Sequence, residues 1–196
     1  AATTTPTVHT ATITDDDAQP TVSWTSASQA SANESGTMSV TAQLSAVSGL
    51  DVTVPYTVTG SATATDYTIT ASPMTILAGA TTGTATITIT ADALNEISET
   101  VVLTMGTLTN GSPGATTTHT ATITDNDAQP TVTFTAGSQS SAESVTTQTI
   151  TVALNTASGL SVTVPFTVSG SATTTVDYTI TTSPVVIAAG ATTTVI

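Results

Sequence analysis

The sequence contains no Lys, no Arg and no Cys, and aromatic residues make up only 3% of its 196 positions. Because no Lys or Arg can neutralise phosphate groups, we expect no nucleic acid as a partner. For the same reason we expect no electrostatic attraction to anionic membrane surfaces. The absence of Cys excludes disulfides, so stability has to come from a packed core, bound ions or neighbouring repeats. There is no apolar run of about 18 residues, and we predict no membrane insertion in this segment.

The acidic residues have no basic counterparts. The chain carries 13 Asp and Glu residues, and its formal net charge is -13. Carboxylates that lie close together in this chain must therefore stay solvated, accept N–H bonds, take up protons or bind a cation from solution.

A long internal repeat organises the chain. The segment HTATITDDDAQP begins at His9, and HTATITDNDAQP begins 110 residues later at His119. Likewise SGLDVTVPYTVTGSAT from Ser48 recurs as SGLSVTVPFTVSGSAT from Ser158. A repeat of this length is a whole domain rather than one coil of a solenoid.

The repeat divides the chain into three parts. Residues 1–17 correspond to the last strand of a preceding repeat, residues 18–127 to one complete repeat, and residues 128–196 to a partial repeat without its final third. We therefore expect separate domains that follow one another along the chain.

Apolar residues in the complete repeat alternate with Thr and Ser, which is typical of half-buried strands. Breaks at Gly49, Gly60, Gly79 and Asn110-Gly111, together with Ser72-Pro73, divide it into roughly seven short strands. The pattern predicts an all-β fold of tandem seven-stranded antiparallel β-sandwiches of the immunoglobulin-like kind.

Most acids stand at strand ends or in loops. A lone Asp in a turn usually serves local backbone hydrogen bonds. Here acids recur at equivalent positions, as Glu34 and Glu143 do, and as Asp66 and Asp177 do. The complete repeat carries seven such carboxylates in four separated segments: Glu34, Asp66, Asp92, Glu96, Glu99, Asp125 and Asp127.

If the sandwich brings these loops to one end, each pair of charges costs on the order of 1 to 4 kcal/mol. Ca²⁺ relieves this repulsion, because it accepts six to eight oxygen ligands in flexible geometry. Mg²⁺ keeps its own waters, and Zn²⁺ prefers His or Cys. The sequence therefore predicts Ca²⁺ as the bound ion.

The two histidines stand apart from this chemistry. Each precedes its Asp by six residues on a strand, a separation of about 20 Å, so His9 and His119 cannot share an ion with those acids. There is also no G-x-S-x-G, H-E-x-x-H or P-loop motif. We predict that the chain is not an enzyme. The equivalent aromatic pairs, Trp24 with Phe134 and Tyr56 with Phe166, are interpreted as core residues or inter-repeat contacts.

Four motifs of the complete repeat resemble the Calx-beta family. They are Ser35-Gly36 after Glu34, SATATDYTI from Ser61, ITADALNEISETVVLT from Ile89 and TATITDNDAQP from Thr120. The resemblance implies a seven-stranded sandwich that binds Ca²⁺ at one end through the seven acids above. Ala91 and Asn126 depart from the family's acid-rich pattern, which implies fewer or weaker ions.

The resemblance also assigns the remaining acids. Asp15, Asp16 and Asp17 would belong to the metal site of a preceding repeat. Glu143 and Asp177 would begin a third metal site, whose other ligands lie beyond Ile196.

Our leading hypothesis is a calcium-binding structural repeat of a long extracellular or cell-surface bacterial protein, an adhesin stalk or an extracellular filament. The short Ala-Gln-Pro linker leaves little slack, so Ca²⁺ at each junction would make it rigid. The expected partners are neighbouring repeats of the same chain and identical subunits in a filament. An alternative is a glycan- or protein-binding accessory module of a secreted hydrolase, and a third is fibre assembly by strand exchange.

Overall fold

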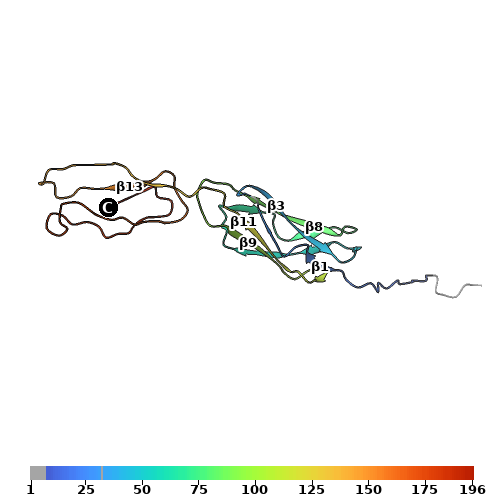
Figure 1. Ribbon diagram of the computed structural model, residues 1–196. Helices are drawn as coiled ribbons and strands as arrows, with labels where there is room; N and C mark the ends of the chain where they lie inside the picture. Colours follow the sequence, from blue (N-terminus) through green and yellow to red (C-terminus); the bar gives the residue numbers. More distant parts are fainter. Residues whose placement is uncertain (1–7, 32) are drawn as a thin grey trace, which may run out of the picture.

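The computed structural model describes residues 8–31 and 33–196 and is an elongated molecule (Figure 1). Strands β1 to β11 form one β-sandwich in the middle, and the strands around β13 form a second unit beyond it. Within the described part, no helix is long and apolar enough to cross a membrane. The predicted all-β class and sandwich architecture are confirmed.

The complete repeat folds into two facing sheets and a short ribbon. The first sheet has the strand order β10 (Ser112–Pro113), β1 (Thr21–Trp24), β3 (Gly36–Leu44), β8 (Thr82–Ile89) and β6 (Tyr67–Ile69). The second has the order β2 (Ser28–Ala30), β11 (Thr118–Ile123), β9 (Glu99–Met105) and β5 (Tyr56–Gly60). The ribbon pairs β4 (Val52–Val54) with β7 (Met74–Ile76).

Two stretches that the pattern predicts as single strands are each divided in two, and a further pair of strands is separated at a predicted break. Pro55 separates β4 from β5, because proline lacks the N–H that a ladder needs. Ser72-Pro73 lies between β6 and β7. The first strand is divided into β1, which pairs antiparallel with β3, and β2, which crosses to the other sheet and pairs parallel with β11. The described part of this repeat therefore has eleven strands, β10 among them, where the pattern predicts roughly seven.

The core fills the space between the two sheets. Alternate residues of β3, namely Met38, Val40, Ala42 and Leu44, are buried, as the period of two requires. Trp24 is 2% exposed and packs edge-on against Tyr56, with ring centroids 6.2 Å apart. His119 lies 6.5 Å from Trp24 and is also buried. The interpretation of Trp24 and Tyr56 as core residues is confirmed.

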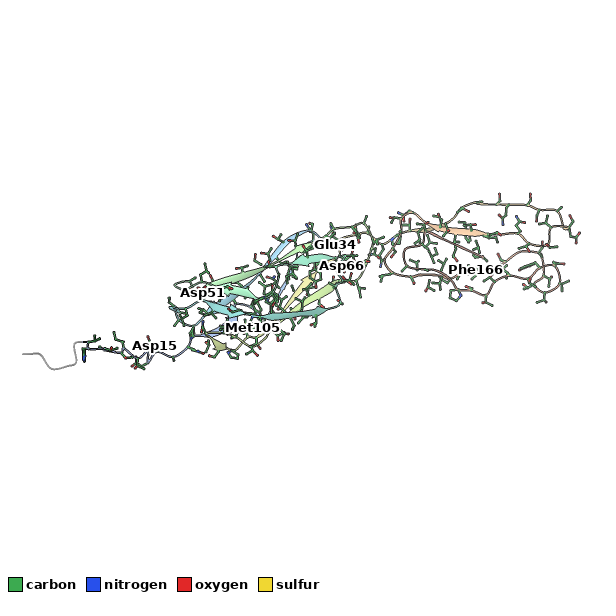
Figure 2. All side chains as sticks on the ribbon, turned by 180° about the vertical axis from the view of Figure 1, so that it is seen from behind. Asp15, Glu34, Asp51, Asp66, Met105 and Phe166 are labelled. Atoms are coloured by element: carbon green, nitrogen blue, oxygen red, sulfur yellow. The ribbon has the colours of Figure 1, made fainter. Side chains whose placement is uncertain are left out.

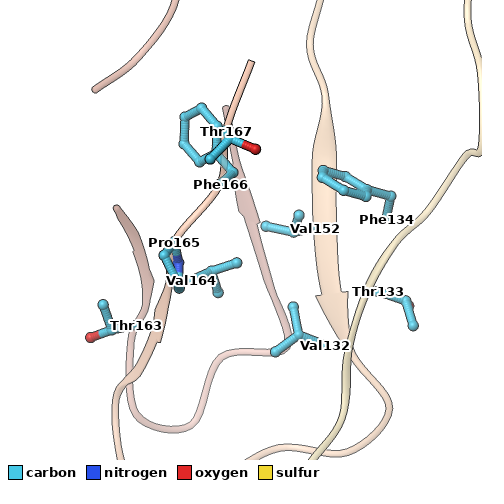
Figure 3. A pocket seen from close by; sticks show the side chains of 9 residues that line it. All are labelled: Val132, Thr133, Phe134, Val152, Thr163, Val164, Pro165, Phe166 and Thr167. Carbon is cyan, nitrogen blue, oxygen red and sulfur yellow. The ribbon is translucent and has the colours of Figure 1, made fainter. Parts of the chain in front are cut away.

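The partial repeat forms two smaller sheets. They contain β12 (Val132–Phe134), β13 (Thr151–Leu154) and β16 (Thr193–Val195), and β14 (Val162–Val164) with β15 (Val185–Ile187). Between them is a cavity of about 700 Å³ that Val132, Phe134, Val152 and Phe166 line (Figure 3). Phe134, the equivalent of buried Trp24, is 55% exposed. The cavity is thus an open core and not a pocket shaped for a ligand.

Residues 8–17 extend from the other end of the complete repeat (Figure 1). They are exposed and form no strand, and residues 1–7 of the predicted last strand lie outside the described residues. The assignment of 1–17 to a preceding repeat therefore stays a prediction.

Candidate metal centre

The loops at one end of the complete repeat carry seven of its eight acids. Figure 2 shows Glu34 and Asp66 at the end that faces the partial repeat, whereas Asp51 and Asp15 lie toward the opposite end. Glu34 stands between β2 and β3, and Asp92 and Glu96 stand in the loop after β8. The sandwich therefore gathers loops that are far apart in the sequence at a single end.

Two hydrogen-bonded contacts hold these loops in place. The backbone N–H of Thr124 donates to Ser31 Oγ at 3.0 Å, and the Thr124 hydroxyl donates to the Ser31 carbonyl at 2.9 Å. The N–H of Glu34 donates to Asn126 Oδ1 at 3.4 Å. The segment after β11 is thereby fixed beside the loop that carries Glu34.

Five acids form two overlapping groups with Glu34 in common. One group is Glu34, Asp92 and Glu96, and the other is Glu34, Asp125 and Asp127. Within each group, one oxygen per residue lies within 4.8 Å of the others. Two ligands on opposite sides of a calcium ion are also about 4.8 Å apart, since each Ca–O bond is about 2.4 Å.

Glu34 is the most unusual carboxylate of the cluster. Its side chain is 6% exposed, and Oε2 is buried without a hydrogen-bond partner among the described residues. Oδ2 of Asp127 is likewise buried and unpaired within that part of the chain. A buried anionic oxygen without a partner is costly, so both oxygens favour a cation beside them.

The cluster strongly disfavours ionisation of its members. Burial, followed by repulsion from Asp92, Asp125, Asp127 and Glu96, raises the pKa of Glu34 to about 7. Burial and the neighbouring carboxylates also raise the pKa of Glu96. Because the chain has no Lys or Arg, no such side chain can neutralise these carboxylates, and uptake of protons or of a cation from solution would relieve the repulsion.

Asp66 and Glu99 form an adjacent pair. Burial, a hydrogen bond to Asp66 and the Asp66 and Glu96 charges raise the pKa of Glu99 to about 7. Burial raises the pKa of Asp66, but hydrogen bonds from Thr63, Glu99 and Thr65 outweigh it and the net shift is downward. These opposite shifts favour a proton on Glu99 rather than on Asp66 when the pair shares one.

Asn95 links the acidic loop to the segment after β11. Its Nδ2 donates to Asp125 Oδ2 and to the Asp127 carbonyl, both at 3.2 Å. Asn95 is not among the residues predicted from the sequence. An amide between Asp92 and Glu96 in the run ITADALNEISETVVLT is the signal that points to it, since an amide can donate to carboxylates that otherwise repel each other.

The same loop contacts the partial repeat. Asn95 and Ser158 form a parallel β-bridge, and the Asn95 carbonyl accepts from Gly159 N–H at 3.2 Å and from the Ser158 hydroxyl at 3.1 Å. A Cβ at Gly159 would lie 2.2 Å from Glu96 Oε1. The candidate metal cluster and the junction between repeats are therefore contiguous.

The remaining predicted ligands are not part of this cluster. Asp15, Asp16 and Asp17 are exposed, and Asp17 N–H donates to Asp15 Oδ1 at 3.2 Å, as Asp127 N–H does to Asp125 Oδ1. Glu143 and Asp177 are also exposed. Asp177 Oδ2 accepts from Thr173 N–H at 2.7 Å, much as Asp66 accepts from Thr63. Their roles as ligands stay predictions.

The set of donor atoms suits calcium. Every candidate ligand in the cluster is a carboxylate oxygen, supplied by several loops, which is the ligand type of a hard cation. His119 does not join the cluster, because its Nδ1 lies 2.7 Å from the Ser26 carbonyl within the core. The site therefore lacks the nitrogen and sulfur ligands that zinc prefers.

Comparison with known proteins gives one family and a set of similar structures. The family described as the Calx-beta domain matches residues 15–129 and, a second time, residues 125–196. The crystal structure of the apo-form Calx CBD1 domain is similar with a TM-score of 0.50 and 15% identity, over 56% of this chain and 100% of that one. The crystal structure of CBD12 from CALX1.2 has a TM-score of 0.50 and 18% identity, over 90% of this chain and 73% of that one. Among proteins with curated descriptions, none matches the chain.

Proposed function

The chain belongs to the Calx-beta family, and from this premise we propose that the acid cluster of its complete repeat binds Ca²⁺ and is a structural rather than a catalytic site. The two groups of ligands that share Glu34 would hold two neighbouring ions, with the Glu34 carboxylate between them. Asp66 and Glu99 lie beside the first group and would complete the coordination there.

One observation supports this proposal above the others. Glu34 buries an anionic oxygen that has no partner among the described residues, inside a cluster that raises its pKa. Such a group destabilises the fold unless a counter-ion is present. A cation with several oxygen ligands removes both the repulsion and the unsatisfied oxygen.

We further propose that the ions make the junction between repeats rigid. Glu96 belongs to the cluster, and the neighbouring Asn95 carries the hydrogen bonds to Ser158 and Gly159. A bound ion would fix the loop on which the next repeat rests. The repeat would then act as a stiff unit of an extracellular bacterial stalk or filament, where calcium sites of modest affinity are filled.

Titration calorimetry tests the proposal. Calcium-free chain should bind Ca²⁺ and bind Mg²⁺ much more weakly, since Mg²⁺ demands a tighter octahedral site. Small-angle X-ray scattering should be measured with calcium and with chelator. The profile with calcium should fit a narrower range of angles between the two repeats than the profile with chelator. Absence of calcium binding would overturn the proposal, and binding without any change in shape would overturn its second half.

A further inference from the structure

The junction in this chain shows how one repeat rests on the next. Ser158, which is 1% exposed, and Gly159 both donate to the carbonyl of Asn95. The Gly159 α-carbon lies close to the Glu96 side chain. A Cβ added to Gly159 would lie 2.5 Å from Glu96 Cγ. Only a residue without a side chain fits this close approach.

The complete repeat carries the same loop at its other end. Ser48-Gly49-Leu50 is equivalent to Ser158-Gly159-Leu160, and both serines accept from the leucine N–H, at 3.0 and 3.1 Å. Their carbonyls accept from corresponding glycines further along the chain, at 2.9 Å for Ser48 and 2.7 Å for Ser158. The two loops thus have the same local shape.

Only one of the two loops is covered in the described part of the chain. Leu50 is 61% exposed, whereas Leu160 is 39% exposed. A Cβ at Gly49 would meet no atom within 4 Å, whereas a Cβ at Gly159 would overlap Glu96. Within the described residues, no acceptor takes the Gly49 N–H, whereas the Gly159 N–H donates to Asn95.

Acidic residues stand beside the uncovered loop, as they do at the junction. Asp15 and Asp17 line a cavity of about 290 Å³ together with Ser48, Gly49 and Leu50. At the junction between the two repeats, the Asn95 side-chain amide donates to the carboxylate of Asp125 and to the backbone carbonyl of Asp127, which are equivalent to Asp15 and Asp17. The uncovered end therefore has a glycine at the position of Gly159 and the same two acceptor residues for an amide.

We infer that Ser48–Leu50, with Asp15 and Asp17, is a docking surface for the Asp92–Glu99 loop of another copy of this repeat. The asparagine of that loop would pair with Ser48 as Asn95 pairs with Ser158. Its side-chain amide would donate to Asp15 and Asp17. The partner is a second acidic loop of the same sequence type. The contact consists of hydrogen bonds to the backbone and the side chain of its asparagine, and neither Ser48 nor Gly49 has to bind calcium.

An extended chain tests this inference. A second copy of residues 18–110 fused directly before Ala1 supplies one more acidic loop and retains the full chain. Hydrogen exchange at Gly49 N–H should slow about tenfold relative to the original chain, because the amide gains an acceptor. Gly159 N–H, which already has its acceptor, is the internal reference in both chains.

Matched variants separate docking from general stabilisation. Gly49→Ala should abolish the added protection in the extended chain and leave the original chain unchanged. Because the chain has no Cys, Ser48→Cys combined with Asn95→Cys in the added copy should form a disulfide. It should form as readily as the disulfide between Ser158→Cys and Asn95→Cys in the original chain. Unchanged exchange at Gly49, or cross-linking well below that of the reference pair, would overturn the inference. Calcium binding by the original chain is measured separately, so its failure leaves this result intact.

Discussion

Asn95 and Ser158 pair in a parallel β-bridge although 63 residues separate them. The Asn95 carbonyl accepts from the partial repeat, while its amide donates to Asp125 and Asp127 of the complete repeat. One residue therefore joins the candidate ligands to the junction. A change on either side of this bridge should therefore affect the other side.

Glu34→Gln should reduce the stabilisation of the chain by calcium to about half or less. In the unaltered chain, calcium at 100 times its dissociation constant should add about 2.7 kcal/mol to the free energy of unfolding. The substitution removes the carboxylate common to both groups, so affinity should fall about tenfold or more. Without calcium, the variant should melt higher than the unaltered chain, because a buried repulsive charge is gone. Calorimetric melting with calcium and with chelator measures both effects.

Asp51→Asn is the matched control for that substitution. Asp51 carries the same charge but accepts a hydrogen bond from Ala78 N–H outside the cluster. It should lower the melting temperature slightly and leave the calcium response intact. Equal calcium responses in Glu34→Gln and the unaltered chain would contradict the assignment of Glu34 as a ligand.

The calcium-free chain should lose stability as pH rises from 5 to 8. The pKa of Glu34 and that of Glu99 are each raised from 4.5 to about 7 in the folded chain. A group whose pKa is raised by folding contributes its full stabilisation of the folded chain below the unfolded pKa of 4.5. This contribution is lost as the pH rises through the folded pKa of about 7. Saturating calcium should remove the loss, because the ion needs the deprotonated carboxylates. Melting temperatures across this range, in chelator and in calcium, measure the effect.

A double variant, Glu34→Gln with Glu99→Gln, provides the control for the pH series. Neither amide titrates, so the calcium-free stability of this variant should change much less between pH 5 and 8. A chain whose calcium-free melting temperature rises over that range would contradict the raised pKa values.

The fold was predictable because its signals are local. The alternation of Met38, Val40, Ala42 and Leu44 marks one buried face, and the 110-residue repeat divides the chain into units. The division of the first strand between two sheets was not predictable. It depends on which partner each half meets, β3 or β11, and hydrophobic alternation carries no information about that choice.

Trp24→Phe should destabilise the complete repeat, because Trp24 is a core residue. The substitution introduces the residue type that is present at the equivalent position 134. The indole N–H donates to the Thr117 carbonyl at 3.1 Å, and the Phe variant leaves that carbonyl without this donor. Lost packing and the lost hydrogen bond should destabilise the complete repeat by about 1 to 3 kcal/mol. Circular dichroism during denaturation measures this cost. Phe134→Leu, at a 55% exposed position, is the control and should cost less.

The gathering of acids at one end was predictable from the sequence, but the contacts around them were not. The seven acids that the sequence groups together lie at one end of the complete repeat, because strand ends and loops of a sandwich meet there, and their roles as ligands stay a prediction. Asn95 and Gly159 could not be identified, since each acts through a contact between loops. Such contacts depend on the angle at which one repeat meets the next, and a single sequence does not encode that angle in any local pattern.

Gly159→Ala should weaken calcium binding although Gly159 lies in the other repeat. The added Cβ would lie 2.2 Å from Glu96 Oε1 and 2.5 Å from its Cγ, so the whole Glu96 side chain has to move. Glu96 belongs to the group with Glu34 and Asp92, and its displacement removes one ligand from that group. The dissociation constant should therefore rise about tenfold, within the range found when support of a ligand is lost.

Gly49→Ala makes the comparison quantitative, because it is the same change at the equivalent loop position with open space around it. Calorimetric titration of both variants distinguishes a local backbone effect from displacement of Glu96. A backbone effect would alter both variants alike, whereas displacement would alter only Gly159→Ala. Equal calcium affinities in the two variants would mean that the junction does not hold Glu96. A weakened affinity in Gly159→Ala alone would show that one repeat helps to form the calcium site of its neighbour.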